Sequence, residues 1–249
     1  LALYLRCVMW SSVHLFIAAP TKMQAANISQ ENIEKIWEYF PLLKNEVKQF
    51  YFNKDSTKLI FHNGSKLDVV QVAQSARGGR RHGGAIEEIV DETMKRDVLH
   101  EVVIPMMANN RIAACGGYDP NENHKTTTYV TTAGTRQSFA FDKQMEVLKA
   151  MVEGKNAFTL GAGYELPVLH NQLDLDFIVG LKESDTFNPL GFMREYQSEW
   201  SGSSDRSLVS FEDINECRVL PKAEEKNMDK NAMYVLSYDV ARAEGLANA

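Results

Sequence analysis

Cysteine is scarce in this chain of 249 residues, with three copies far apart at Cys7, Cys115 and Cys217. Their spacing excludes the paired cysteines of a zinc site, and their odd number does not fit a disulfide framework. Separate thiols of this kind are typical of a reducing compartment. The six histidines also lack the spacing of metal ligands, and no Ser-His-Asp or Cys-His arrangement can be recognised.

An excess of positive charge is lacking as well. Asp and Glu outnumber Lys and Arg by 33 to 27, which gives a formal net charge of -6. A generally basic surface for nucleic acid is therefore excluded, and any such contact has to be local, as at residues 77–81. The remaining composition, 44% hydrophobic and 24% charged, is ordinary for a globular protein.

The chain has no long uninterrupted apolar run. Residues 1–19 are strongly apolar, but Arg6 and His14 interrupt them, and a membrane-spanning helix needs about 20 apolar residues. We therefore expect no contact with a membrane. Residues 1–10 are interpreted as the end of a helix and residues 13–18 as a buried strand.

No phosphate loop of the type Gly-x-x-x-x-Gly-Lys-Ser/Thr is present, so the sequence contains no complete cradle for nucleotide phosphates. The chain also starts inside a predicted helix and stops shortly after a predicted strand at residues 233–242. A strand that only begins a new unit cannot bury its faces alone. We therefore expect this chain to be a middle piece of a longer protein.

Strand-like and helix-like segments alternate along the chain, which predicts a mainly parallel α/β sheet flanked by helices. A hairpin is expected around Asn63-Gly64, because this pair favours a tight turn. A charged segment without apolar periodicity, residues 221–231, is the clearest linker. The expected strands cover residues 13–18, 58–61, 66–73, 84–86, 126–132, 157–161 and 233–242. The expected helices cover residues 1–10, 23–40, 42–52, 91–107, 136–152 and 191–200.

The most informative stretch runs from residue 75 to residue 92. A glycine-rich loop with Arg77, Arg80 and Arg81 precedes a short apolar strand, residues 84–86, which ends in two acids. In a nucleotide-hydrolysing sheet the first acid helps to hold magnesium and the second polarises the attacking water. The arginines can supply cations to phosphate or to a neighbouring chain.

Two other interpretations of this stretch stay open. An exposed basic turn followed by an ordinary amphipathic helix, residues 86–94, also fits the pattern. The acids of the first interpretation are Glu87 and Glu88, but Asp91 and Glu92 form a second pair that also follows two apolar residues.

Hydroxyl groups lie at the carboxyl ends of two further predicted strands. Thr21 and Lys22 come after the strand at residues 13–18, where α/β sheets place ligands, and can face phosphate or a DNA backbone. Thr21 can equally serve as the N-cap of the next helix. Thr131 and Thr132 end the strand predicted at residues 126–132, and Gly134 follows it. Hydroxyls there can sense a γ-phosphate, although a polar exit from an edge strand explains them as well.

Asp239 lies within the last predicted strand. A carboxylate among apolar residues is costly unless it is paired or bound to metal. Metal binding in a nuclease centre and a salt bridge to Arg242 both satisfy that requirement.

Taken in order, the segments at residues 18–21, 75–81, 86–88, 131–134 and 238–242 resemble the large subunit of tailed-phage or prophage terminases. The resemblance extends over nearly the whole chain. It implies a P-loop ATPase domain of the additional-strand, conserved-glutamate (ASCE) type, joined to an RNase H-like nuclease domain. Residues 1–220 would be the ATPase domain without its Walker A portion, 221–231 the linker, and 232–249 the first strand of the nuclease.

The resemblance also implies roles for individual residues. Glu87 and Glu88 match the Walker B pair, with Glu87 near magnesium and Glu88 as the catalytic glutamate; Asp91-Glu92 remains the rival pair. The residues of the coupling motif, which links hydrolysis to DNA movement, are Thr131, Thr132, Ala133 and Gly134. Asp239 matches the first metal-binding aspartate of the nuclease. The implied cofactors are ATP and Mg²⁺, with Mg²⁺ or Mn²⁺ at the nuclease centre.

The resemblance further implies a packaging motor in the host cytoplasm, on the viral procapsid. Its partners would be double-stranded DNA, the portal protein, the small terminase subunit and copies of itself in a ring. Arg77, Arg80 or Arg81 would reach a γ-phosphate in trans or touch the DNA backbone. Because the phosphate loop and the other nuclease acids are missing, the piece alone is expected to be inactive. A helicase-like P-loop translocase and a non-catalytic α/β assembly protein are the alternatives.

Overall fold

The computed structural model describes residues 1–91, 93–94, 96–119, 126–202 and 215–216. The chain divides into two compact units, Leu1–Leu208 and Val209–Ala249, and the fold of the first is described below. The predicted linker and Asp239 lie outside the described residues.

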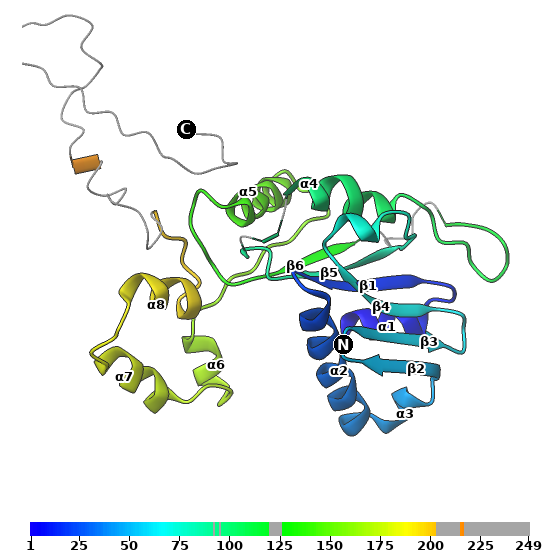
Figure 1. The fold of residues 1–249 in the computed structure, drawn as a ribbon, viewed down its shortest axis with the longest axis horizontal. Coiled ribbons are helices and arrows are strands. Elements are labelled where there is room, and N and C mark those ends of the chain that lie inside the picture. Colours follow the sequence, from blue (N-terminus) through cyan, green and yellow to red (C-terminus); the bar gives the residue numbers. More distant parts are fainter. Residues whose placement is uncertain (92, 95, 120–125, 203–214, 217–249) are drawn as a thin grey trace, which may run out of the picture. The chain divides into compact units, whose positions relative to one another are not determined.

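The first unit is built on a six-stranded sheet with the strand order β2-β3-β4-β1-β5-β6 (Figure 1). Strands β4, β1, β5 and β6 are parallel, whereas β2 and β3 add an antiparallel extension at one side. The prediction of a mainly parallel α/β sheet is therefore confirmed. The strands are β1 His14–Ala19, β2 Val47–Asn53, β3 Ser56–Phe61, β4 Lys66–Gln71, β5 Gly83–Glu87 and β6 Thr127–Val130.

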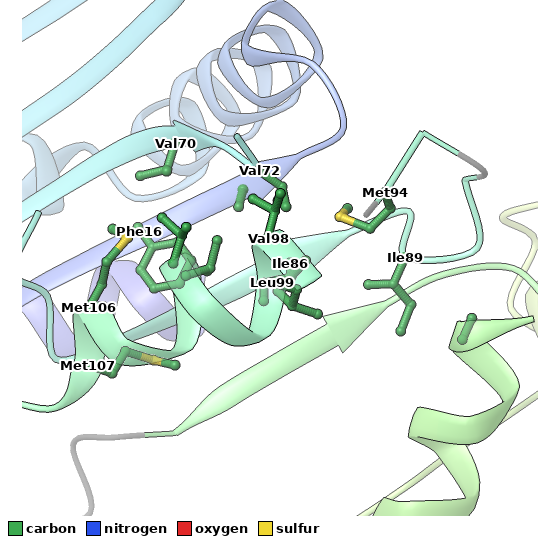
Figure 2. Close-up of a cluster of buried hydrophobic side chains, with 14 residues drawn as sticks. Phe16, Val70, Val72, Ile86, Ile89, Met94, Val98, Leu99, Met106 and Met107 are labelled. Carbon is green, nitrogen blue, oxygen red and sulfur yellow. The ribbon is translucent and has the colours of Figure 1, made fainter. Parts of the chain in front are cut away.

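Helices lie on both faces of the sheet. On one face α1 and α2 pack on Leu15 and Leu59, and on the other the helical segment from α4 to η3, together with α5, packs on Phe16 and Ile86 (Figures 1 and 2). Adjacent residues of β1 are thus buried on opposite faces, as expected for a central parallel strand. The α-helices are α1 Ala2–Met9, α2 Lys22–Tyr39, α3 Pro41–Lys44, α4 Arg96–Val98, α5 Phe139–Val152, α6 Glu165–Leu169, α7 Leu175–Glu183 and α8 Pro189–Tyr196. Three short helical turns of other types are η1 Gln74–Ala76, η2 Leu99–Val103 and η3 Ile104–Met107.

The predicted hairpin at Asn63-Gly64 is confirmed. Gly64 takes a φ of 83°, a left-handed conformation that glycine adopts without steric cost. The Asn63 side chain donates hydrogen bonds to the carbonyl oxygens of Cys7 and Val8 at 2.8 and 3.0 Å, near the end of α1. The turn residue therefore also satisfies carbonyl groups that a helix end leaves unpaired.

Three sequence-based interpretations of secondary structure are wrong. The helix expected at residues 42–52 ends at Lys44, because the following aromatic and β-branched residues pair as β2 with β3. Residues 157–161 have no regular secondary structure and pair with no strand of the sheet. The alternative helix at residues 86–94 is also absent, because Gly83–Glu87 is held in the sheet by two neighbouring strands.

A partly buried ion pair holds the arginine-glycine loop against the sheet, with the side chains of Arg81 and Asp68 12% and 16% exposed. Arg81 donates two hydrogen bonds to Asp68 of β4, from Nε at 3.0 Å and from a terminal nitrogen at 2.7 Å. His14 Nε2 of β1 lies 3.3 Å from the same carboxylate. Burial alone would raise the pKa of Asp68, but His14 and Arg81 outweigh it and hold that pKa below its ordinary value.

Strand β5 lies so close to β1 that one position requires glycine. Gly84 is opposite Phe16, and a Cβ on Gly84 would lie 2.5 Å from the Phe16 carbonyl oxygen and 2.6 Å from its ring. Glycine at this position thus allows the acid-bearing strand to pair with β1.

We expect Gly84→Ala to lower the free energy of unfolding by about 2 kcal/mol or more, since the main-chain oxygen of Phe16 cannot move without disturbing strand pairing. Gly180→Ala in α7 is the matched control. An added Cβ there meets nothing within 4 Å, and alanine favours a helix by about 1 kcal/mol. Urea denaturation measures both variants, and equal effects would contradict the close approach.

We expect Asp68→Asn to lower the free energy of unfolding at pH 7 by about 3 kcal/mol, because the largely buried Arg81 loses its charged partner. A carboxyl group with a depressed folded-state pKa stabilises the fold above its unfolded pKa of about 3.9, and that contribution is lost as the pH falls through the folded-state value. Urea unfolding should therefore show wild type and variant converging as the pH falls below the folded-state pKa of Asp68.

The control for this variant is Asp142→Asn. Arg96 and Asp142 are 3.8 Å apart with side chains 63% and 61% exposed, so their pair is worth less than about 1 kcal/mol. A pH-independent loss in Asp68→Asn would show that the carboxylate charge is unimportant there.

Candidate active site

The two predicted catalytic acids lie where the interior strand β5 leaves the sheet. Glu87 is the last residue of β5 and is opposite Val130 of β6. Glu88 follows with a φ of 54°, a left-handed conformation that costs a non-glycine residue about 1 kcal/mol. Its amide still donates to the Val130 carbonyl oxygen at 2.8 Å, and its own carbonyl accepts from the Asp91 amide at 3.0 Å. The chain therefore turns sharply at Glu88 while it stays bonded to the sheet.

The electrostatics of this turn disfavour ionised acids. Partial burial raises the pKa of Glu87, and the neighbouring Glu88 carboxylate raises it further. Burial likewise raises the pKa of Glu88, followed by the negative charges of Glu195 and Asp91. Each strand-end acid thus has a carboxylate neighbour that disfavours its charged form, and a cation bound there would relieve this repulsion.

Val90 connects this turn to the predicted coupling motif. The Val90 amide donates a hydrogen bond to the Thr131 hydroxyl at 3.2 Å. The Val90 side chain also occupies the space that a Cβ on Gly134 would need. The structure therefore brings together two segments that are far apart in the sequence, through one polar and one packing contact.

A cavity of about 810 Å³ adjoins β6 and the predicted coupling motif. Thr131 and Thr132 line it, together with Lys143 of α5 and the segment at residues 156–162. Lys143 is buried, and its ammonium group is paired with Glu146 and lies 5.8 Å from the centre of the Tyr129 ring. Glu87 and Glu88 do not line this cavity, but Ile89, the residue that follows them, does.

The rival acid pair does not occupy a strand end. Asp91 lies in the bend after β5, where its side chain accepts hydrogen bonds from the amide and hydroxyl of Thr93 at 2.8 and 2.6 Å. Glu92 lies outside the described residues. Position at the carboxyl end of a strand therefore favours Glu87 and Glu88 over the second pair.

The three arginines of the loop differ in their surroundings. Arg81 is committed to Asp68, whereas Arg77 and Arg80 are exposed. The Arg77 guanidinium donates to the side-chain oxygen of Gln74 at 3.1 Å, which lies on the same surface turn. Contact with a phosphate therefore remains a prediction for Arg77 and Arg80. Arg81 could contact a phosphate only if its hydrogen bonds to Asp68 were broken.

Thr21 forms the N-cap of α2. Its hydroxyl accepts from the Gln24 amide at 3.2 Å and donates to the Gln24 side chain, whose oxygen also accepts from the Thr21 amide. This capping box confirms the capping interpretation of Thr21. Lys22 lies at the start of the helix and lines a pocket with Arg77.

Sequence reasoning missed the Asp68 cluster and Glu195, because no local pattern connects these residues to β5. Within the described ranges, no group of three His, Cys, Asp or Glu side chains is arranged to hold a metal ion. In the same ranges, no helix is long and apolar enough to cross a membrane.

No protein-family model matches the chain, and no curated protein matches it. Solved structures do match. The large terminase of a thermophilic bacteriophage superposes with a TM-score of 0.51 at 10% sequence identity, over 80% of this chain and 43% of the terminase. The ATPase domain of the large terminase of Thermus phage P74-26 superposes with a TM-score of 0.50 at 11% identity, over 80% of each chain.

These matches concern the fold, since the identities are low. This chain spans less than half the length of the first of these two terminases. Its sheet and flanking helices are similar to those of phage large terminase ATPase domains, which confirms the predicted P-loop ATPase-like fold.

Proposed function

We propose that this chain is the ATPase part of a viral DNA-packaging motor. The main support for this proposal is a pair of contacts made by Val90, which lies two residues after Glu88. Its amide donates a hydrogen bond to Thr131, and its side chain packs against Gly134. In such a motor, ATP hydrolysis at the two acids has to change the position of another part of the protein. The Val90 hydrogen bond and its packed side chain provide a short physical connection between the acids and that part. The fold similarity to phage large terminase ATPase domains supports the same function.

The acid pair suits Mg²⁺ bound together with a nucleotide. Mg²⁺ is usually held by one or two carboxylates and completes its shell with phosphate oxygens and water, which is consistent with Glu87 and Glu88 as a pair without a third ligand among the described residues. Bound Mg²⁺ would neutralise phosphate charge during transfer to water. Glu87 would hold the ion, and Glu88, turned out of the strand by its backbone, would orient and polarise the attacking water.

Thr131, Thr132 and Gly134 would pass the state of the site to the rest of the motor. Arg77 or Arg80 would approach a phosphate of a neighbouring subunit in the ring, because both are exposed on a surface loop. In the whole motor, double-stranded DNA, the portal protein and the small terminase subunit would be the partners, in the host cytoplasm on the procapsid. Asp239 would belong to a metal-dependent nuclease with Mg²⁺ or Mn²⁺.

Replacement of the catalytic glutamate tests the proposal. In the full gene product, we expect Glu88→Gln to lower ATP turnover about 100-fold or more, because the amide cannot take up a proton from water. Nucleotide affinity should stay within about twofold, since the substitution removes no phosphate contact. Phosphate release measures turnover, and the fluorescence of a labelled ATP analogue measures affinity.

Glu195→Gln is the matched control. Glu195 contributes to the negative potential at Glu88 but comes from α8 and not from the strand end. Turnover within about threefold of wild type is expected for it. Normal turnover in Glu88→Gln, or equal losses in both variants, would remove Glu88 from the catalytic role.

A further inference from the structure

A second pocket contains a concentration of positive charge that the overall charge does not reveal. Its volume is about 490 Å³, and it lies between β3, β4, the start of α2 and the loop before β5. Lys22, Lys58 and Arg77 line it from three different elements, in a chain whose net charge is -6. Neither Glu87 nor Glu88 lines this pocket, so it lies apart from the acids of the candidate active site, although Arg77 is among its lining residues.

The positive charges of this pocket are not neutralised from within. Asp68 is the one carboxylate among its lining residues, all of which belong to the described part of the chain. That carboxylate already accepts two hydrogen bonds from Arg81. The charges of Lys22, Lys58 and Arg77 therefore remain to attract an anion, and the hydroxyls of Ser56 and Ser75 offer further donors at the wall.

The basic surface continues from the pocket onto the sheet. Lys58 is opposite Asp68 of β4 on one side and Tyr51 of β2 on the other, and directly opposed residues of neighbouring strands share a face. Tyr51 is 48% exposed, and Lys66 is exposed two residues before Asp68 on β4. An extended anion can thus lie across this face and place one of its charges in the pocket.

We propose that this pocket binds a phosphate of the DNA backbone, with Lys22 and Lys58 as its principal ligands. The choice of duplex DNA rests on the proposed motor function. The chemistry favours a phosphodiester over a nucleotide triphosphate, because a triphosphate normally brings Mg²⁺ and the single carboxylate is already committed to Arg81. Lysine contacts of this kind position DNA without reading its sequence.

Duplex binding without nucleotide tests the proposal. Fluorescence anisotropy of a labelled duplex of about 30 base pairs is measured with the full gene product over a range of salt concentrations. For the double variant Lys22→Ala/Lys58→Ala we expect Kd to rise about tenfold or more, equally for unrelated sequences. The slope of log affinity against log salt should fall by about 2, because each lysine that no longer neutralises a phosphate lowers it by roughly one.

The matched control is Lys35→Ala/Lys149→Ala, which removes the same charge from exposed positions of α2 and α5 outside the pocket. Kd for this control should change less than about threefold, and Lys22→Arg/Lys58→Arg should keep most of the affinity. Thermal unfolding of all variants checks that the fold is retained. Because no ATP is hydrolysed in this assay, a failure of Glu88 as catalyst leaves its result unaffected.

Three results would overturn the proposal. Equal losses in the pocket and control variants would show a general charge effect. Unchanged duplex affinity in the pocket variant would exclude a phosphate contact there. Reduced affinity for a labelled ATP analogue with unchanged duplex affinity would assign the pocket to a triphosphate.

Discussion

The pairing of β5 with β1 on one side and β6 on the other is the constraint on which the site depends. Both pairings are parallel, so the carboxyl ends of the three strands meet at one edge of the sheet. Gly84 allows β5 to lie close to β1, and Ile86 is completely buried against the helical segment that follows α4. Glu87 emerges from the sheet only because the strand before it is held in this way.

The candidate site combines a strained turn with unfavourable electrostatics, and both have a structural cause. Glu88 adopts a left-handed conformation because its amide remains bonded to β6 while the chain reverses toward Asp91. Burial raises the pKa of both strand-end acids, and neighbouring carboxylates raise it further, Glu88 for Glu87 and Glu195 with Asp91 for Glu88. Backbone strain and repulsion of this kind are typical of sites that are stabilised by a ligand.

Local patterns predicted the parts of the fold that local chemistry decides. The apolar residues of β5 followed by two acids, the Asn63-Gly64 turn and the Thr21 N-cap all have local causes. Strand β2 was missed because its first residues continue an apolar spacing that also fits a helix. Only pairing with β3 decides in favour of the strand.

The parts of the site that sequence reasoning missed depend on contacts between distant segments. Arg81 was expected to face phosphate, but Asp68 and His14 become its neighbours only when β4, β1 and the loop assemble. The sequence did not indicate a role for Lys58, because only the pairing of β3 with β4 places it opposite Asp68. The contact of Val90 with Thr131 and Gly134 likewise requires β5 and β6 to be neighbours.

We expect the turn after β5 and the predicted coupling motif, residues 131–134, to respond to nucleotide as one unit. Amide hydrogen exchange of the full gene product, with and without Mg²⁺ and a slowly hydrolysed ATP analogue, tests it most directly. We predict that the amides of residues 88–91 and 131–134 gain protection together when the nucleotide binds. Protection of one segment without the other, or of neither, would contradict a shared response through Val90.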